Sequence, residues 1–131
     1  MLRRGWVWLF DVPADGLLSN ETRNSGDAAD KPRPWLIVGD RGRKDGVVTA
    51  VPLTTQRPRN YRAWHVELNP SDYEHQPTPP AMLMAATSYA RVDQMRALDL
   101  ARHVPHSHAK LKKGPFDKIV STCAEYVHPS R

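Results

Sequence analysis

The sequence predicts an α+β fold: a small twisted barrel or half-barrel of antiparallel strands followed by one C-terminal α-helix. The first observation is a series of short apolar runs, rich in aromatic and β-branched residues, that prolines and glycines separate along the first 98 residues. The second is a change of period near the C-terminus, where apolar residues recur at helical spacing. We expect the 131 residues to form a single domain.

The first half of the chain contains three predicted strands. Residues 5–11 are rich in aromatic and β-branched side chains and form the first. Residues 13–32 are a long polar connection, and such a loop in a compact domain is usually functional or mobile. A continuous apolar run at residues 35–38 and a second strand at residues 47–53 flank a basic turn at residues 39–46. We therefore expect these two strands to form an antiparallel hairpin with a long loop.

The second half contains weaker strand signals and one helix signal. Residues 61–68 place Trp64, Val66 and Leu68 on one face and are predicted as a strand, and residues 69–80 as a proline-rich loop. Residues 82–92 and 94–98 are predicted as two further strands, although Ala, Met and Leu in the first would equally support a helix. Gly114–Pro115 opens the helix, whose apolar face consists of Phe116, Ile119, Val120, Cys123 and Val127.

The composition favours a basic intracellular protein. Lys and Arg number 19 against 14 Asp and Glu, giving a net charge of +5 and a pI near 9.7. This charge favours polyanions such as nucleic acid or anionic lipid, although many small soluble proteins carry it without such a partner. The single cysteine, Cys123, excludes an intrachain disulfide and fits a reducing cytoplasm. The N-terminal apolar run is too short for a signal peptide, and no stretch approaches the ~20 apolar residues of a membrane span.

Four segments resemble, in the same order, sequence motifs of the MazF/PemK/Kid toxins. Residues 4–9 (RGWVWL) resemble the opening strand of these toxins, and residues 31–38 (KPRPWLIV) resemble their Arg-Pro strand entry. Residues 50–56 (AVPLTTQ) resemble their Pro-Leu-Thr-Ser strand exit, and residues 91–99 (RVDQMRALD) their Asp-Gln-x-Arg-Thr-x-Asp segment. The final amphipathic helix also matches, so the resemblance spans almost the whole chain.

The resemblance implies a fold and an activity. The fold is a twisted SH3-like or CcdB-like β-barrel with a C-terminal helix, usually homodimeric. The activity is sequence-specific, metal-independent cleavage of single-stranded RNA such as mRNA, which inhibits growth until a cognate antitoxin protein neutralises the toxin. No cofactor is implied. Two alternatives use the same fold: a CcdB-like inhibitor that binds a protein such as DNA gyrase, and a basic barrel that binds RNA without cutting it.

A carboxylate beside a guanidinium can cut RNA without a metal ion, because the 2′-OH of RNA can itself attack the adjacent phosphorus. The enzyme must deprotonate that hydroxyl, protonate the leaving 5′-oxygen and stabilise the phosphorane. Asp93 can accept the proton, while Arg91 can stabilise the phosphorane or donate to the leaving group. On a strand, both side chains would project from one face. These positions match the catalytic Arg and Asp of the Kid branch, and the alternative is an ordinary surface ion pair.

Two further residues complete the expected catalytic set. Arg33 matches an arginine of MazF-type sites, and its guanidinium can grip a phosphate with two hydrogen bonds. Thr54 matches the threonine whose hydroxyl lies near the scissile phosphate in that family, and Thr55 stands where relatives often have serine. The alternatives are a solvated strand-entry residue for Arg33 and turn chemistry for the threonines.

The residues beyond this set carry expectations of their own. Thr55, Gln94 and Arg96 are expected to bind RNA or shape the site, although Arg96 could instead pair with Asp99. Residues 12–32 contain no histidine, so the loop histidine of the Kid branch is missing here. The connection at residues 69–80 is longer than in typical members, which could alter the substrate groove or the dimer contact.

Histidines and tryptophans are the remaining side chains that could bind a metal ion or a nucleobase. His103, His106 and His108 lie in what we interpret as a proline-broken loop without a nearby cysteine, so we expect no metal site. Tryptophan side chains can stack on bases, but most are expected to fill the core. They are Trp6, Trp8, Trp35 and Trp64.

Overall fold

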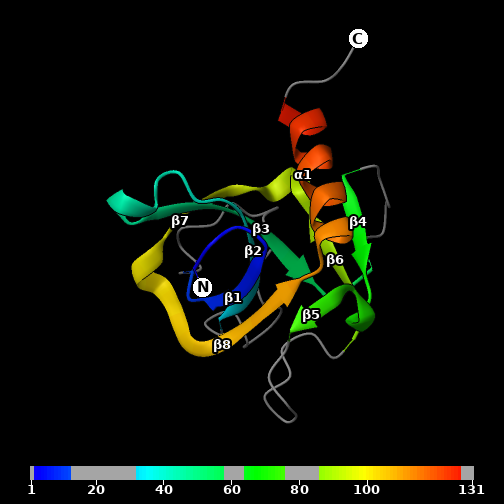
Figure 1. Ribbon diagram of the computed structural model, residues 1–131, viewed down its shortest axis with the longest axis horizontal. Helices are drawn as coiled ribbons and strands as arrows, with labels where there is room; N and C mark the ends of the chain where they lie inside the picture. Colours follow the sequence, from blue (N-terminus) through cyan, green and yellow to red (C-terminus); the bar gives the residue numbers. More distant parts are fainter. Residues whose placement is uncertain (1, 13–31, 58–63, 76–85, 128–131) are drawn as a thin grey trace.

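The computed structural model describes residues 2–12, 32–57, 64–75 and 86–127, and the polar connection predicted at residues 13–32 lies outside these ranges except for Pro32. Strands and a C-terminal α-helix make up most of this part, which confirms the α+β class (Figure 1). Their bounds are β1 Trp6–Phe10, β2 Arg33–Gly39, β3 Val47–Thr54, β4 His65–Leu68, β5 Tyr73–His75, β6 Ser88–Arg91, β7 Arg96–Asp99, β8 His103–Leu111 and α1 Lys113–Val127.

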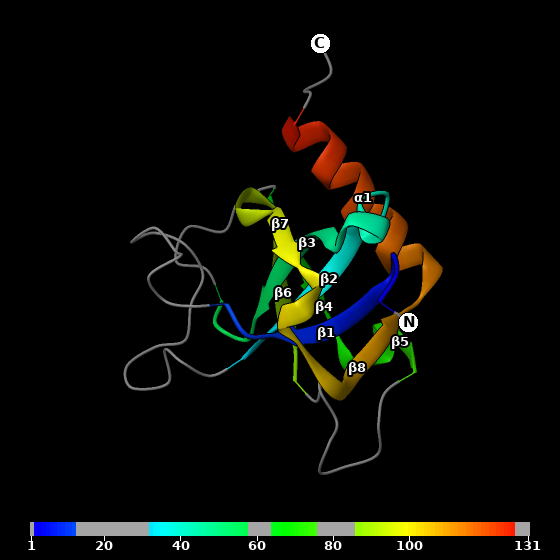
Figure 2. The ribbon, with the colours of Figure 1, turned by 90° about the vertical axis from the view of Figure 1, so that its left-hand side faces the viewer.

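The strands form one strongly coiled antiparallel sheet in the order β4-β6-β3-β2-β1-β8-β5. Strand β7 lies off this path and pairs with β3. Within the described residues no pairing joins β4 to β5, so the sheet is an open barrel rather than a closed ring. Figure 2 shows α1 lying along one end of this coiled sheet.

The predicted hairpin of β2 and β3 is confirmed and occupies the middle of the sheet. Its register sets Trp35 opposite Pro52 and Leu36 opposite Val51. The basic turn between the strands contains a short 3₁₀ helix, Arg43–Asp45, and ends at Gly46 with φ of 81°. Glycine adopts this left-handed conformation without the steric penalty that a Cβ would bring.

Alternation along the central strands divides the apolar side chains between two cores, one on each face of the sheet. Val7 and Leu36 belong to the core under α1, which also contains Ile119 and Cys123 of the helix. Their neighbours in sequence belong to the second core, which consists of Trp8, Phe10, Trp35, Ile37, Val48, Ala50 and Leu98. A strand that is buried on both faces has no polar positions, which explains the continuous apolar run at residues 35–38.

Helix α1 buries the first part of its apolar face. Ile119 and Cys123 are buried, and Phe116 packs against the same core. Val127, which continues the helical spacing, is 66% exposed. Gly114 and Pro115 lie in the first turn, where proline is tolerated because that N–H has no partner within the helix. No helix in the described part of the chain has the length and apolar character needed to cross a membrane.

Two segments predicted as loops contain regular secondary structure, so these predictions are wrong. The proline-rich connection at residues 69–80 contains a 3₁₀ helix, Pro70–Asp72, and strand β5, while residues 76–80 lie outside the described ranges. Residues 103–108, predicted as a proline-broken loop, belong to strand β8, which pairs with β1. Pro105 fits there because the register of β1 and β8 shifts between Trp8 and Phe10, and such an irregularity needs no N–H from proline.

The burial difference along α1 predicts a difference in stability between two matched variants. Ile119→Ala should lower the free energy of unfolding by about 2–5 kcal/mol, because it leaves a cavity between helix and sheet. Val127→Ala removes an exposed side chain and should change it by less than about 0.5 kcal/mol. Urea denaturation measures both values, and equal losses in the two variants would contradict this packing.

The thiol of Cys123 predicts a loss of stability at alkaline pH. Burial raises the pKa of Cys123 from the ordinary value of 9.0 to about 11. The folded state therefore favours the protonated thiol, so this contribution is complete below pH 9.0 and disappears as the pH rises to about 11. Between these limits the urea midpoint of the wild type should fall more steeply than that of Cys123→Ala. Parallel curves would show that the thiol ionises equally in both states.

Candidate active site

The register of β3, β6 and β4 brings predicted site residues onto one face of the sheet. Thr54 of β3 pairs with Tyr89 of β6, and Arg91 of β6 pairs with His65 of β4. Tyr89 and Arg91 are two residues apart on one strand, so their side chains share a face. That face is opposite the core under α1, because the intervening Ala90 belongs to that core.

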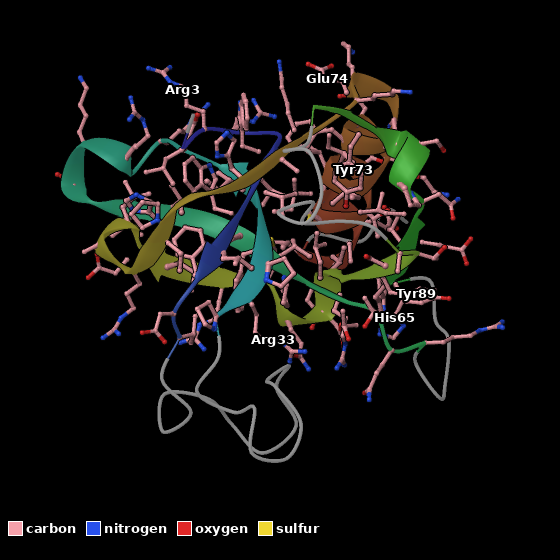
Figure 3. All side chains as sticks on the ribbon, turned by 90° about the horizontal axis from the view of Figure 1, so that it is seen from below. Arg3, Arg33, His65, Tyr73, Glu74 and Tyr89 are labelled. Atoms are coloured by element: carbon pink, nitrogen blue, oxygen red, sulfur yellow. The ribbon has the colours of Figure 1, made fainter. Side chains whose placement is uncertain are left out.

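Arg33, at the start of β2, joins this face. Arg33 lies two residues before Trp35, which pairs with Pro52, so its side chain shares the face of Trp35 near the end of β3. Figure 3 shows Arg33, His65 and Tyr89 toward the same side of the molecule. The sheet thus collects the predicted residues Arg33, Thr54 and Arg91 from separate segments of the chain.

The guanidinium of Arg33 is half-buried and offers hydrogen bonds that no described residue accepts. Its Nε and Nη1 atoms are buried and have no hydrogen-bond partner among the described residues. Desolvation lowers the pKa of Arg33, since burial disfavours the charged form. A guanidinium still carries its proton at neutral pH. Because unsatisfied buried donors are unfavourable, an anion that accepts them would bind here with a gain in free energy.

Arg91 and Asp93 form an ion pair, although they do not share a strand as predicted. Strand β6 ends at Arg91, and Asp93 lies in the 3₁₀ helix Val92–Gln94, here η5. Nη2 of Arg91 still lies 3.1 Å from Oδ2 of Asp93, and the two side chains are 27% and 28% exposed. The pair is therefore accessible to a ligand. The turn that carries Asp93 is anchored by a hydrogen bond from the Val92 N–H to the Trp64 carbonyl, 3.0 Å long.

Sequence reasoning missed His65, which contacts the second oxygen of Asp93. Nε2 of His65 lies 3.7 Å from Oδ1 of Asp93, and the histidine side chain is only 5% exposed. No local signal marks His65, because a strand pairing brings it across from Arg91. Only the antiparallel register of β4 and β6 reveals the contact.

The C-terminal end of α1 supports the turn that carries Asp93. The Tyr126 hydroxyl donates a hydrogen bond to the backbone carbonyl of Asp93, at 3.4 Å. The Tyr126 ring packs edge-on against Trp64, with centroids 5.1 Å apart. The helix therefore contacts the site through η5 as well as the core through Ile119.

The other predicted residues surround this arrangement. Oγ1 of Thr54 accepts a hydrogen bond from the Gln56 N–H at 3.2 Å, which is turn chemistry, yet its own hydroxyl proton can still be donated. Thr55 is exposed just after β3 ends. Gln94 lies beside Asp93 in η5, and Arg96 begins β7 opposite Ala50.

The described residues do not bring three potential metal-binding side chains of His, Cys, Asp or Glu together. His103 and His108 instead contact Trp8, with ring centroids 5.3 and 4.6 Å away, while the side chain of His106 lies outside the described set. Trp8 and Trp35 are buried, as expected for core tryptophans.

The candidate site contains two guanidiniums, a carboxylate, an imidazole and a hydroxyl. This set is suited to binding a phosphodiester and moving protons.

Three solved structures share this fold at low sequence identity. An endoribonuclease from a Mycobacterial species in complex with its cognate antitoxin is 21% identical, with a TM-score of 0.64 over 98% of this chain and 97% of that chain. The Mycobacterium tuberculosis toxin MazF-mt6 is 12% identical, with a TM-score of 0.59 over 95% and 98%. MazF from Deinococcus radiodurans is 18% identical, with a TM-score of 0.57 over 95% and 94%. These likenesses establish the fold.

The assignment to a protein family comes from the amino-acid sequence. The search of curated proteins found no match for this chain. Residues 3–127 match the family described as PemK-like, MazF-like toxin of type II toxin-antitoxin system. This match covers almost the whole sequence, including every residue of the candidate site. The chain therefore belongs to the PemK-like, MazF-like family of type II toxins.

Proposed function

We propose that this protein is a sequence-specific, metal-independent endoribonuclease toxin that cuts single-stranded RNA. The observation that carries the proposal is the Arg91–Asp93 ion pair, partly exposed on the face that also holds Arg33 and Thr54. A carboxylate and two guanidiniums around one phosphate supply a base and electrostatic stabilisation. We propose that residues 1–131 act as one domain in the cytoplasm and assemble as a homodimer.

The proposed reaction begins with proton transfer from the ribose 2′-OH to the Asp93 carboxylate. The 2′-oxygen attacks phosphorus, and the P–O5′ bond breaks with its electron pair remaining on the 5′-oxygen. That oxygen takes a proton from the Arg91 guanidinium or from solvent, which leaves a 2′,3′-cyclic phosphate and a 5′-hydroxyl. Arg33 and Arg91 stabilise the additional negative charge of the phosphorane. The Thr54 hydroxyl donates to a non-bridging oxygen.

The nucleophile in this scheme belongs to the RNA, so no metal-activated water is required. We propose that Gln94, next to Asp93 in η5, Arg96 at the start of β7 and Thr55 just after β3 contact nucleotides next to the cut. The buried Arg33 donors, which no residue of the described ranges accepts, favour this nuclease over an inhibitor of a protein such as DNA gyrase. An inhibitor surface would have no need for a desolvated cation beside an acid–base pair.

Cleavage of single-stranded RNA in EDTA tests the proposal. Wild-type protein should release fragments with 5′-hydroxyl ends, and Arg91→Ala or Asp93→Asn should each lower kcat/KM by about 10²–10⁴-fold. The matched controls Arg43→Ala and Asp45→Asn remove similar charges from the exposed turn after β2 and should keep full activity.

Other outcomes of this assay identify the alternatives. Intact RNA with poisoned gyrase would indicate a CcdB-like inhibitor, and RNA binding without cleavage would indicate a non-catalytic barrel. Cleavage that EDTA abolishes would contradict metal independence.

A cognate antitoxin is the second proposed partner. The Mycobacterial endoribonuclease of the same fold is in complex with its antitoxin, and the net charge of +5 here favours an acidic segment. Association should weaken as salt rises from about 0.05 to 0.5 M, because ions screen exposed charges. Titration calorimetry at several salt concentrations measures this, and an affinity independent of salt would contradict the electrostatic interface.

A further inference from the structure

His65 is a buried imidazole for which the proposed reaction has no role so far. Its side chain is 5% exposed and lies on β4, directly opposite Arg91 of β6. Histidine is the side chain whose charge changes near physiological pH. A titratable imidazole therefore lies beside the carboxylate of the candidate site.

The two oxygens of Asp93 face two different cationic groups. Oδ2 receives the Arg91 guanidinium at 3.1 Å, while Oδ1 has Nε2 of His65 at 3.7 Å. Oδ1 is a buried atom that makes no hydrogen bond within the described structure. A movement of a few tenths of an ångström would bring the imidazole N–H into hydrogen-bonding distance. The carboxylate therefore has a permanent cation beside one oxygen and a titratable imidazole beside the other.

We propose that His65 is a positioning residue for the Asp93 carboxylate and that its protonation sets the acid limb of the pH–rate profile. The proposal rests on the nuclease function proposed above. As the pH falls, His65 gains a proton and becomes an imidazolium beside Oδ1. Its charge then favours the ionised carboxylate under the conditions where solvent would otherwise protonate it. Asp93 thus remains able to accept the 2′-OH proton at lower pH than Arg91 alone would allow.

Several titratable or charged groups reach this pair from the elements packed around it. Beside His65 and Asp93 these groups are Arg91 and Tyr89 of β6, Glu67 of β4 and Tyr126 of α1. Arg91 is permanently charged, Glu67 is exposed, and Tyr126 binds the backbone of Asp93 rather than its carboxylate. His65 is therefore the group in this set whose charge can change near neutral pH and act directly on Oδ1.

The kinetic test compares His65→Gln with the wild type. Glutamine places an amide N–H near the position of Nε2 but cannot become charged, so activity should stay within about fivefold of wild type at about pH 8. At about pH 4, where an aspartate without a neighbouring cation is about half protonated, the loss should be several-fold larger, because the variant has no imidazolium beside the carboxylate. His65→Ala should lose activity at both pH values and retain the same steeper acid limb. The control His103→Gln, on β8, should keep the wild-type profile.

A second measurement does not depend on cleavage. In NMR titrations the midpoint of the His65 ring signal should move to lower pH in Asp93→Asn, because the carboxylate that stabilises the imidazolium is gone. An unchanged midpoint would overturn the proposal, as would equal losses of activity at both pH values in a His65→Gln variant with wild-type stability. If the wild type cleaves no RNA, the proposed function fails, and this titration still decides whether His65 and Asp93 are coupled.

Discussion

The architecture depends on a change of partner along β3. Residues 47–50 of this strand pair with β7, and Leu53 and Thr54 pair with β6. The interruption includes Pro52, which has no N–H to donate to a neighbouring strand. Because the chain passes from β6 to β7 at this break, η5 lies beside β3 there, and η5 carries Asp93. A gap in one ladder of hydrogen bonds thus provides the place for the carboxylate of the site.

The second consequence of this arrangement is electrostatic. The start of β2, the end of β3, the end of β6 and β4 lie on neighbouring strands, and the Arg91 guanidinium and the His65 imidazole face the two oxygens of the Asp93 carboxylate. Two buried donors of Arg33 have no acceptor within the part of the chain that the structure describes, and a bound anion that accepts them would stabilise the folded state. Buried polar groups that lack partners within the protein are typical of sites that bind a ligand.

Helix α1 links the stability of the domain to the geometry of the site. Its first turns bury Ile119 and Cys123 in the core beneath the sheet, and its last turn reaches η5 through Tyr126. The hydroxyl and ring contacts of Tyr126 hold the backbone of Asp93 and the side chain of Trp64. The helix end therefore supports the backbone of the turn, while Arg91 and His65 lie beside the two oxygens of the carboxylate.

Local patterns in the sequence determined the α+β class, the β2–β3 hairpin and the helical face of Phe116, Ile119 and Cys123, because each depends on residues close together in the chain. The spacing of Arg91 and Asp93 also indicated their ion pair. Only the tertiary structure decided that β8 is a strand, that Asp93 lies on a 3₁₀ turn, and that His65 contacts it. These features depend on pairings between segments far apart in sequence. Strand register is set by the whole sheet, so no short window of residues contains it.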